Sequence, residues 1–113
     1  MNPVAIIDLG YVGLPLACLC AKRGYRTIGL ERNPDVVVRL KLGQSHIADS
    51  SVEALLNEAQ GSDNFYPTTE LAELEACQRY LICVPTPVDE RFEPNLVPLL
   101  DAIRDIGPYL RVV

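Results

Sequence analysis

The sequence has few of the features that mark nucleic-acid-binding or metal-binding proteins. It contains no tryptophan, two phenylalanines and one histidine. Its four cysteines form no Cys-x-x-Cys pair and no cluster with histidine, so we interpret them as small buried side chains in a reducing compartment and expect no metal site. The formal net charge is −5 and no basic stripe is present, which argues against a nucleic-acid partner.

Long hydrophobic runs are also absent. The longest uncharged apolar stretch, Val12–Ala21, is too short to cross a bilayer. No cationic segment precedes an apolar one as in a signal peptide. We therefore expect a cytoplasmic protein with no membrane partner. The 113 residues, about half of them apolar, are sufficient for one domain with its own core.

Strand and helix signals alternate along the chain. The expected strands are 3–7, 26–31, 64–68, 79–84 and the start of a fifth at 111–113; the expected helices are 12–23, 33–42, 52–59, 70–76 and 95–106. This alternation predicts an α/β fold, a doubly wound parallel sheet of the Rossmann-like type with strand order 3-2-1-4-5. Because the sequence ends at the first residues of the expected fifth strand, we expect residues 1–113 to be a fragment truncated at that strand.

A glycine-containing turn follows the first strand, with the sequence Asp8-Leu9-Gly10-Tyr11-Val12-Gly13. Dinucleotide-binding folds place Gly-x-Gly-x-x-Gly between a strand and a helix, so that the backbone and the helix N-terminus meet a pyrophosphate. This sequence has the second and third glycines, and Asp8 stands in place of the first. We expect a nucleotide site here rather than a generic tight turn, with weakened affinity because the Asp8 carboxylate competes with the ligand.

An acidic residue, Glu31, ends the second strand eighteen residues after Gly13. A carboxylate at this position accepts hydrogen bonds from ribose hydroxyls and repels a 2′-phosphate, which favours NAD over NADP. Arg32 acts in the opposite direction, since an arginine there can hold a 2′-phosphate. A second candidate segment, Val84-Pro85-Thr86-Pro87, follows the fourth strand, which lies beside the first at the switch point of such sheets. Alone, it is more often a rigid turn.

Together these segments resemble the UDP-glucose/GDP-mannose dehydrogenase family, in its N-terminal NAD-binding domain. The resemblance is carried by 9–17, by Gly24-Tyr25, by Gly29–Pro34, by Thr68-Thr69, by Val84–Asp89, and by Pro94–Leu96 with Pro98-Leu99. It covers nearly the whole chain. The pair Gly-Tyr-Val-Gly-Leu-Pro and Val-Pro-Thr-Pro is its most specific part. Within the family, the sequence most resembles the bacterial branch that oxidises UDP-N-acetylhexosamines for surface polysaccharides.

The resemblance implies a cofactor, a reaction and a set of binding residues. Family members oxidise the C6 alcohol of a UDP-sugar to a carboxylate with two NAD, through a cysteine-bound intermediate. The implied contacts are Gly10, Tyr11, Val12 and Gly13 at the pyrophosphate, Glu31 and Arg32 at the ribose, and Pro85 and Thr86 near the nicotinamide. The family's nucleophilic cysteine falls later in its chain, so no catalytic residue is assigned and we expect the fragment itself to be inactive. The implied partners are a nucleotide-sugar substrate and, in the full-length protein, further copies of the same chain.

Two other interpretations remain. The chain is a non-enzymatic Rossmann remnant if Asp8 has ended nucleotide binding. A different NAD enzyme, such as a 3-hydroxyacid dehydrogenase, shares the broad fold, but Val-Pro-Thr-Pro argues against it. His46, in a polar loop, is interpreted as a surface residue.

Overall fold

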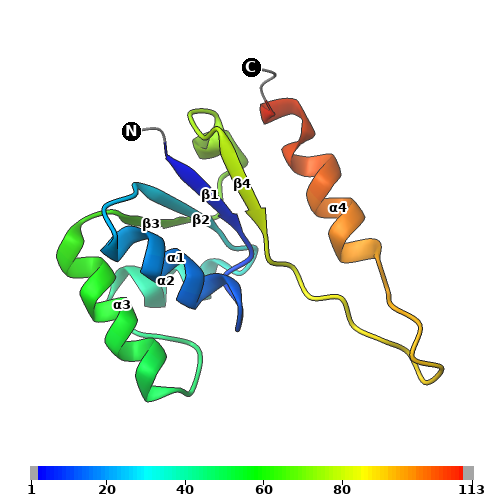
Figure 1. Cartoon of the computed structure of the whole chain (residues 1–113), viewed down its shortest axis with the longest axis horizontal. Coiled ribbons are helices and arrows are strands. Elements are labelled where there is room, and N and C mark those ends of the chain that lie inside the picture. The colour runs from blue at the N-terminus through cyan, green and yellow to red at the C-terminus, as the bar shows by residue number, and fades with distance from the viewer. Residues whose placement is uncertain (1–2, 111–113) are drawn as a thin grey trace.

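The computed structural model describes residues 3–110, which contain a four-stranded parallel sheet (Figure 1). The strands are β1 (Val4–Ile7), β2 (Thr27–Leu30), β3 (Phe65–Thr68) and β4 (Arg79–Ile82). Their order in the sheet is β3-β2-β1-β4, and every neighbouring pair is parallel. This confirms the predicted doubly wound arrangement for the first four strands. The predicted fifth strand, at 111–113, lies outside the described residues.

Helices cover both faces of the sheet (Figure 1). The helical elements are α1 (Gly13–Lys22), α2 (Pro34–Lys41), α3 (Ser50–Ser62), α4 (Val97–Ile106) and two short 3-10 helices, η1 (Leu71–Leu74) and η2 (Gly107–Tyr109). Val4 and Ile6 of β1 pack with α1 and α3, while Ala5 and Ile7 pack with η1 and α4. Since successive strand residues point to opposite faces, burial on both faces explains why β1 is an uninterrupted apolar run.

The start of α2 and the ends of α1 and α2 lie at the capping residues that the sequence predicted. Asn33 accepts a hydrogen bond from the Asp35 N–H at 3.0 Å and Pro34 opens α2. Gly24 and Gly43, just beyond α1 and α2, have φ angles of +95° and +81°. Glycine adopts such left-handed conformations without steric cost, which is why it commonly ends a helix.

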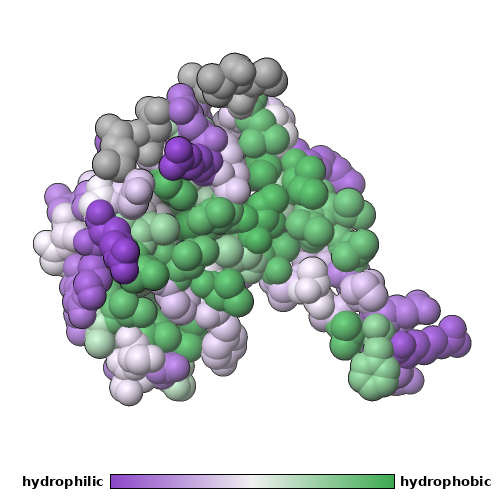
Figure 2. Space-filling view, in the orientation of Figure 1, coloured by the Kyte–Doolittle hydropathy of each residue, from purple (hydrophilic) through white to green (hydrophobic). Residues whose placement is uncertain are grey.

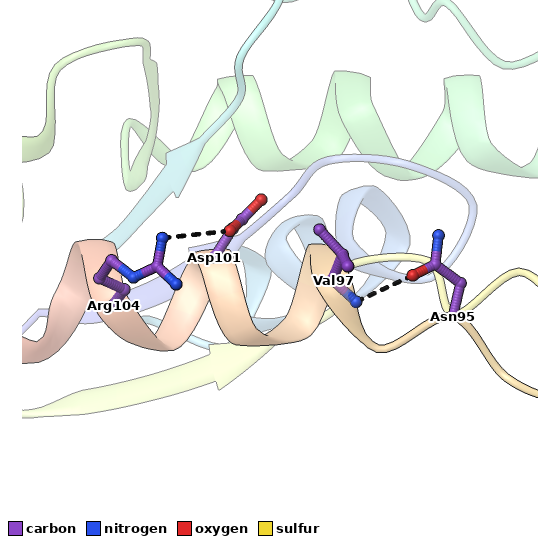
Figure 3. A network of polar contacts seen from close by, with 4 residues as sticks. All are labelled: Asn95, Val97, Asp101 and Arg104. Carbon is purple, nitrogen blue, oxygen red and sulfur yellow. Dashed lines mark hydrogen bonds and ion pairs between the residues drawn. The ribbon is translucent and has the colours of Figure 1, made fainter.

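Three helices differ from the sequence prediction. The helix expected at 52–59 extends over Ser50–Ser62, because Asp49 caps its start by accepting the Ser51 N–H and Asp63, with φ of 58°, ends it in place of a glycine. The helix expected at 70–76 is the single 3-10 turn η1. The helix expected from residue 95 begins at Val97, although Asn95 still accepts the Val97 N–H at 3.0 Å (Figure 3).

Strand β4 is also shorter than expected, since it ends at Ile82 and not at residue 84. The chain then runs away from the sheet as an arm that returns to α4 (Figure 1). The arm folds back on itself through one antiparallel bridge between Val88 and Pro94. On the exposed side of α4, Asp101 and Arg104 form an ion pair at 3.6 Å, which at such exposure contributes little stability (Figure 3).

A band of apolar side chains remains on the surface (Figure 2). Among the exposed apolar residues are Leu19 of α1, Leu81 of β4 and three residues of α4, namely Val97, Leu100 and Ile103, each 39–56% exposed. Within residues 3–110 no strand pairs with the outer edge of β4. Sheet edges and contiguous apolar surface both favour association with another chain.

None of the described helices has both the length and the apolar character of a membrane span.

We predict that the 113-residue chain self-associates as its concentration rises, because α4 and the β4 edge present apolar surface. Replacing Leu100 and Ile103 together by glutamate is expected to shift the molecular mass measured by light scattering toward the monomer. Val38→Glu is the control, since Val38 (56% exposed) is more exposed than Leu100 (53%) and Ile103 (45%) but lies on α2. A wild-type chain that stays monomeric in concentrated solution contradicts the prediction.

Candidate functional site

The turn between β1 and α1 is held by close contact between backbone atoms. Gly13 begins α1, and a Cβ atom built on it would lie 1.8 Å from the carbonyl oxygen of Asp8. No side chain fits in that space. The third glycine of the motif therefore has the role expected for it, because it lets the helix start directly against the end of the strand.

Asp8 adopts the left-handed backbone conformation that glycine normally supplies at this position. Its φ angle is 80°, which aspartate tolerates better than most residues because its short polar side chain bonds locally. The Asp8 Oδ2 atom accepts the Gly10 N–H at 3.2 Å. The carboxylate thus occupies one donor of the turn, although it does not cap α1, which has no side-chain cap.

The remaining donors of the turn are open. The Tyr11 and Val12 side chains are 83% and 66% exposed, and within residues 3–110 their N–H groups have no hydrogen-bond partner. The first turn of α1 contains no acidic residue. An exposed helix start with free N–H groups is the arrangement that binds phosphate. The predicted residues 10–13 therefore form one surface that can receive an anion.

Glu31 lies beside this turn, at the end of the neighbouring strand. The Asp8 N–H donates to the Leu30 carbonyl at 2.8 Å, which aligns the ends of β1 and β2. Only 9% of Glu31 is exposed, and its Oε2 atom accepts the Asn33 N–H at 2.9 Å. The adjacent Arg32 is exposed. The two carboxylates are thus close to each other at the carboxyl edge of the sheet.

Electrostatic repulsion between these carboxylates affects the protonation of Asp8. Partial burial raises the pKa of the Asp8 carboxyl above its usual value, and the charge of Glu31 raises it further. The hydrogen bond from Gly10 and the charges of His46 and Arg32 act in the opposite direction. Asp8 is therefore easier to protonate than an ordinary aspartate.

A cavity of about 290 Å³ opens between the carboxyl edge of the sheet, η1 and α4. Its lining residues are Ile7, Asp8, Leu30, Glu31, Arg32, Thr69, Leu71, Val84, Pro85, Pro98, Ala102, Asp105 and Ile106. The structure thus brings Glu31, Arg32 and Pro85 together in one cavity. Residues 10–13 and Thr86 are not part of its lining, and residues 10–13 form the adjacent turn instead.

Several lining residues were not identified as site residues from the sequence. Thr69 and Leu71 follow β3, and Pro98, Ala102 and Asp105 belong to α4. Leu71 and Ala102 are ordinary apolar residues with no motif of their own. Only the positions of η1 and α4 in the folded chain could have shown that these two residues line the cavity.

The thiols of the described residues are not activated. Burial raises the pKa of the Cys18 thiol to about 12, and it raises the pKa of Cys83, which the charge of Asp8 raises further. No cysteine lines the cavity. Among residues 3–110 no group of three or more His, Cys, Asp or Glu side chains could hold a metal ion. The arrangement is suited to binding a ligand and lacks an evident nucleophile.

His46 is not a simple surface residue, which corrects the expectation from the sequence. The residue is half-buried, and its Nδ1 atom is buried with no hydrogen-bond partner in the described structure.

Comparison with known proteins gives a consistent result. The model of the "UDP-glucose/GDP-mannose dehydrogenase family, NAD binding domain" matches residues 2–113. A UDP-N-acetyl-D-glucosamine 6-dehydrogenase from Pseudomonas aeruginosa is 37% identical over 109 residues, which cover 96% of this chain and 24% of the relative. A UDP-N-acetyl-D-mannosamine dehydrogenase from Methanococcus aeolicus is 34% identical over 114 residues, covering 98% of this chain and 25% of the relative.

Solved structures agree in fold. A UDP-glucose dehydrogenase from Pyrobaculum islandicum has a TM-score of 0.89 and 30% identity, covering 96% of this chain and 26% of that one. A ternary complex of GDP-mannose dehydrogenase from Pseudomonas aeruginosa has a TM-score of 0.86 and 28% identity, covering 95% and 24%. This chain spans about a quarter of the length of the relatives that it matches.

We predict that Gly13→Ala destabilises the chain by at least about 3 kcal/mol, because the new methyl group would overlap the Asp8 backbone. Gly61→Ala is the control, since it lies in α3 and a Cβ there meets nothing within 4 Å. That substitution is expected to stabilise the chain by up to about 1 kcal/mol through helix propensity. Urea unfolding of both variants measures the difference, and equal stabilities would show that the turn can relax around a side chain.

Proposed function

Because this chain belongs to the UDP-glucose/GDP-mannose dehydrogenase family, we propose that it is the NAD-binding domain of a nucleotide-sugar 6-dehydrogenase. The observation that carries the proposal is the turn at Gly13. The backbone at Gly13 packs against Asp8 too closely for any side chain. The exposed N–H groups of the two preceding residues, Tyr11 and Val12, are free to bind a pyrophosphate. The family's cofactor therefore fits the residues that are present.

We assign each predicted binding residue to one part of the cofactor. Residues 10–13 bind the pyrophosphate through their backbone. Glu31 accepts hydrogen bonds from the adenosine ribose, with Arg32 beside it, and the cavity that both line receives the adenosine end. Pro85 lines the same cavity where the chain leaves β4, next to β1, and we assign Pro85 and Thr86 to the side of the cofactor that leads toward the nicotinamide. This assignment places the cofactor along the carboxyl edge of the sheet, across its switch point.

The proposed reaction of the whole protein is oxidation of a UDP-sugar C6 alcohol to a carboxylate with two NAD. Bound NAD supplies the hydride acceptor. The relatives named above act on UDP-N-acetylhexosamines, and we propose a sugar of that class. The residues described here orient the cofactor and provide no nucleophile. Assembly of the whole protein as a cytoplasmic homo-oligomer stays a prediction.

A second candidate function is favoured by the hydrogen bond between Asp8 and Gly10. Because the carboxylate occupies a donor of the turn and adds a negative charge, the chain is a non-enzymatic remnant if dinucleotide binding has been lost. Calorimetric titration with NAD separates the two functions. Measurable binding by the wild type supports the first, whereas no binding by the wild type together with binding by Asp8→Gly supports the second.

We predict that Asp8→Gly tightens NAD binding by roughly ten- to thirtyfold. Two unit charges about 5 Å apart repel by about 3 kcal/mol at an effective dielectric near 20, and screening reduces this to about 1.4–2 kcal/mol. Stability should change little, because glycine adopts the φ of 80° without strain but adds freedom to the unfolded chain. An unchanged dissociation constant for NAD would show that the electrostatic argument is wrong.

We predict that the chain binds NAD at least about tenfold more tightly than NADP, because the Glu31 carboxylate repels a 2′-phosphate. Glu31→Gln keeps an acceptor for the Asn33 N–H and removes the charge, so the preference should narrow. The control Glu53→Gln, on the exposed side of α3, should leave the ratio of the NAD and NADP dissociation constants unchanged. Equal affinity of the wild type for both dinucleotides would overturn the assignment of Glu31.

We predict that the 113-residue chain has no dehydrogenase activity. No cysteine lines the cavity, and the relatives that oxidise these sugars are about four times as long. NADH formation, followed by absorbance with a panel of UDP-sugars, should stay at background even when NAD is saturating. Clear turnover would show that the chain carries its own reactive group.

A further inference from the structure

One side of α4 forms a wall of the cavity at the carboxyl edge of the sheet. Pro98, Ala102 and Asp105 all line that cavity, and their spacing of four and three residues places them on one face of the helix. The helix runs alongside the sheet in the direction opposite to β4 (Figure 1). Pro98 therefore lies nearer the carboxyl edge, and Asp105 lies roughly 10 Å further along the helix axis.

The charges around the cavity suit a neutral group of a ligand and not a phosphate. Three of the lining side chains are carboxylates, those of Asp8, Glu31 and Asp105, and Arg32 is the one cation among them. Apart from Thr69, the other lining residues have apolar side chains. A flat aromatic base is well accommodated between apolar side chains, whereas the carboxylates repel a pyrophosphate.

The size of the cavity leads to the same assignment. Its volume of about 290 Å³ is near the lower end of the range for small-molecule sites, so it holds one part of a dinucleotide and not the whole. With the pyrophosphate at the glycine turn outside the cavity, the part that enters is the adenosine.

The carboxylate of Asp105 has no partner within residues 3–110. It forms no hydrogen bond or ion pair there, and the adjacent Arg104 is paired with Asp101 instead (Figure 3). Asp105 also lies in the last turn of α4, which ends at Ile106. An acid is unfavourable in that turn because the helix dipole places partial negative charge at the C-terminus. Helix stability therefore does not explain this residue. Its side chain is exposed, so a ligand in the cavity can reach it.

We propose that Asp105 is a specificity-determining residue for the base of the dinucleotide, whose carboxylate accepts a hydrogen bond from the exocyclic N6 amine of adenine. The inference rests on the proposed NAD-binding function. The N6 amine is a donor and an ionised carboxylate has only acceptors, so the two groups are complementary. A base without that amine leaves the carboxylate without a donor. Asp105 therefore favours adenine over such a base.

Glu31 and Asp105 then recognise different parts of the same nucleoside. Glu31 ends β2, and its carboxylate is assigned to the ribose. Asp105 belongs to α4, which forms another wall of the cavity. Loss of the Asp105 carboxylate should therefore change the preference for the base and leave the preference for NAD over NADP, which depends on Glu31.

Calorimetric titration of the 113-residue chain with two dinucleotides tests the inference. The first is NAD, and the second is the analogue with unsubstituted purine in place of adenine, in which a hydrogen atom replaces the N6 amine. The wild type is expected to bind NAD about fivefold more tightly than the purine analogue. In Asp105→Ala the two dissociation constants should agree within about twofold. The ratio of constants is diagnostic because removal of a negative charge affects both anionic ligands alike.

Asp101→Ala is the matched control. Asp101 lies one turn earlier on the same helix, its carboxylate contacts Arg104, and it does not line the cavity. This variant should keep the wild-type ratio. Both substitutions introduce a strong helix former at a helical position, so both variants are expected to fold. If the wild type binds too weakly to give constants, the same titrations are made in the Asp8→Gly background.

The outcomes separate this inference from the function on which it rests. Equal affinity of the wild type for NAD and the purine analogue, or an unchanged ratio in Asp105→Ala, overturns the role of Asp105 and leaves NAD binding intact. Loss of the NAD-over-NADP preference in Asp105→Ala also overturns it, because the carboxylate would then act only through its charge. Absence of NAD binding by both the wild type and Asp8→Gly overturns the proposed function, and this inference with it.

Discussion

The geometry of the site depends on the contact between Gly13 and the backbone of Asp8. With no side chain at Gly13, α1 begins directly against the carboxyl end of β1. The helix can then bury Leu14, Ala17 and Ala21 in the core beneath it. The same contact leaves the Tyr11 and Val12 N–H groups at the surface. Packing of the core and exposure of these N–H donors are therefore consequences of one close approach.

Parallel pairing of β1 and β2 creates the electrostatic problem of this site. Ile7 lies beside Leu30 in the register, so the strands end together and place Asp8 and Glu31 at the same edge. Neighbouring groups offset the repulsion. Gly10 and Asn33 donate N–H bonds to the two carboxylates, and Arg32 and His46 supply positive charge near Asp8. A bound dinucleotide would add further negative charge to this edge of the sheet, where the two carboxylates already lie close to positively charged side chains.

Local signals predicted much of the fold. The buried apolar strand β1, the Asn33-Pro34 helix start and the glycines beyond α1 and α2 act within a few residues, so they can be identified in the chain itself. Predictions were wrong at the ends of α3 and in the segment of η1. Asp49 caps the start of α3 and Asp63 ends it in a left-handed conformation that glycine more often adopts, while the segment that connects β3 to β4 forms a single 3-10 turn.

The sequence by itself determined the glycine turn after β1, the acid at the end of β2 and the order of the first four strands, because each follows from short motifs and from strand–helix alternation. Only the tertiary structure decided what surrounds them. The cavity forms because α4, nearly seventy residues after Glu31, packs beside β1 and β4 and contributes Pro98, Ala102 and Asp105. Such proximity is a property of packing between distant segments, and no local pattern in the chain encodes it.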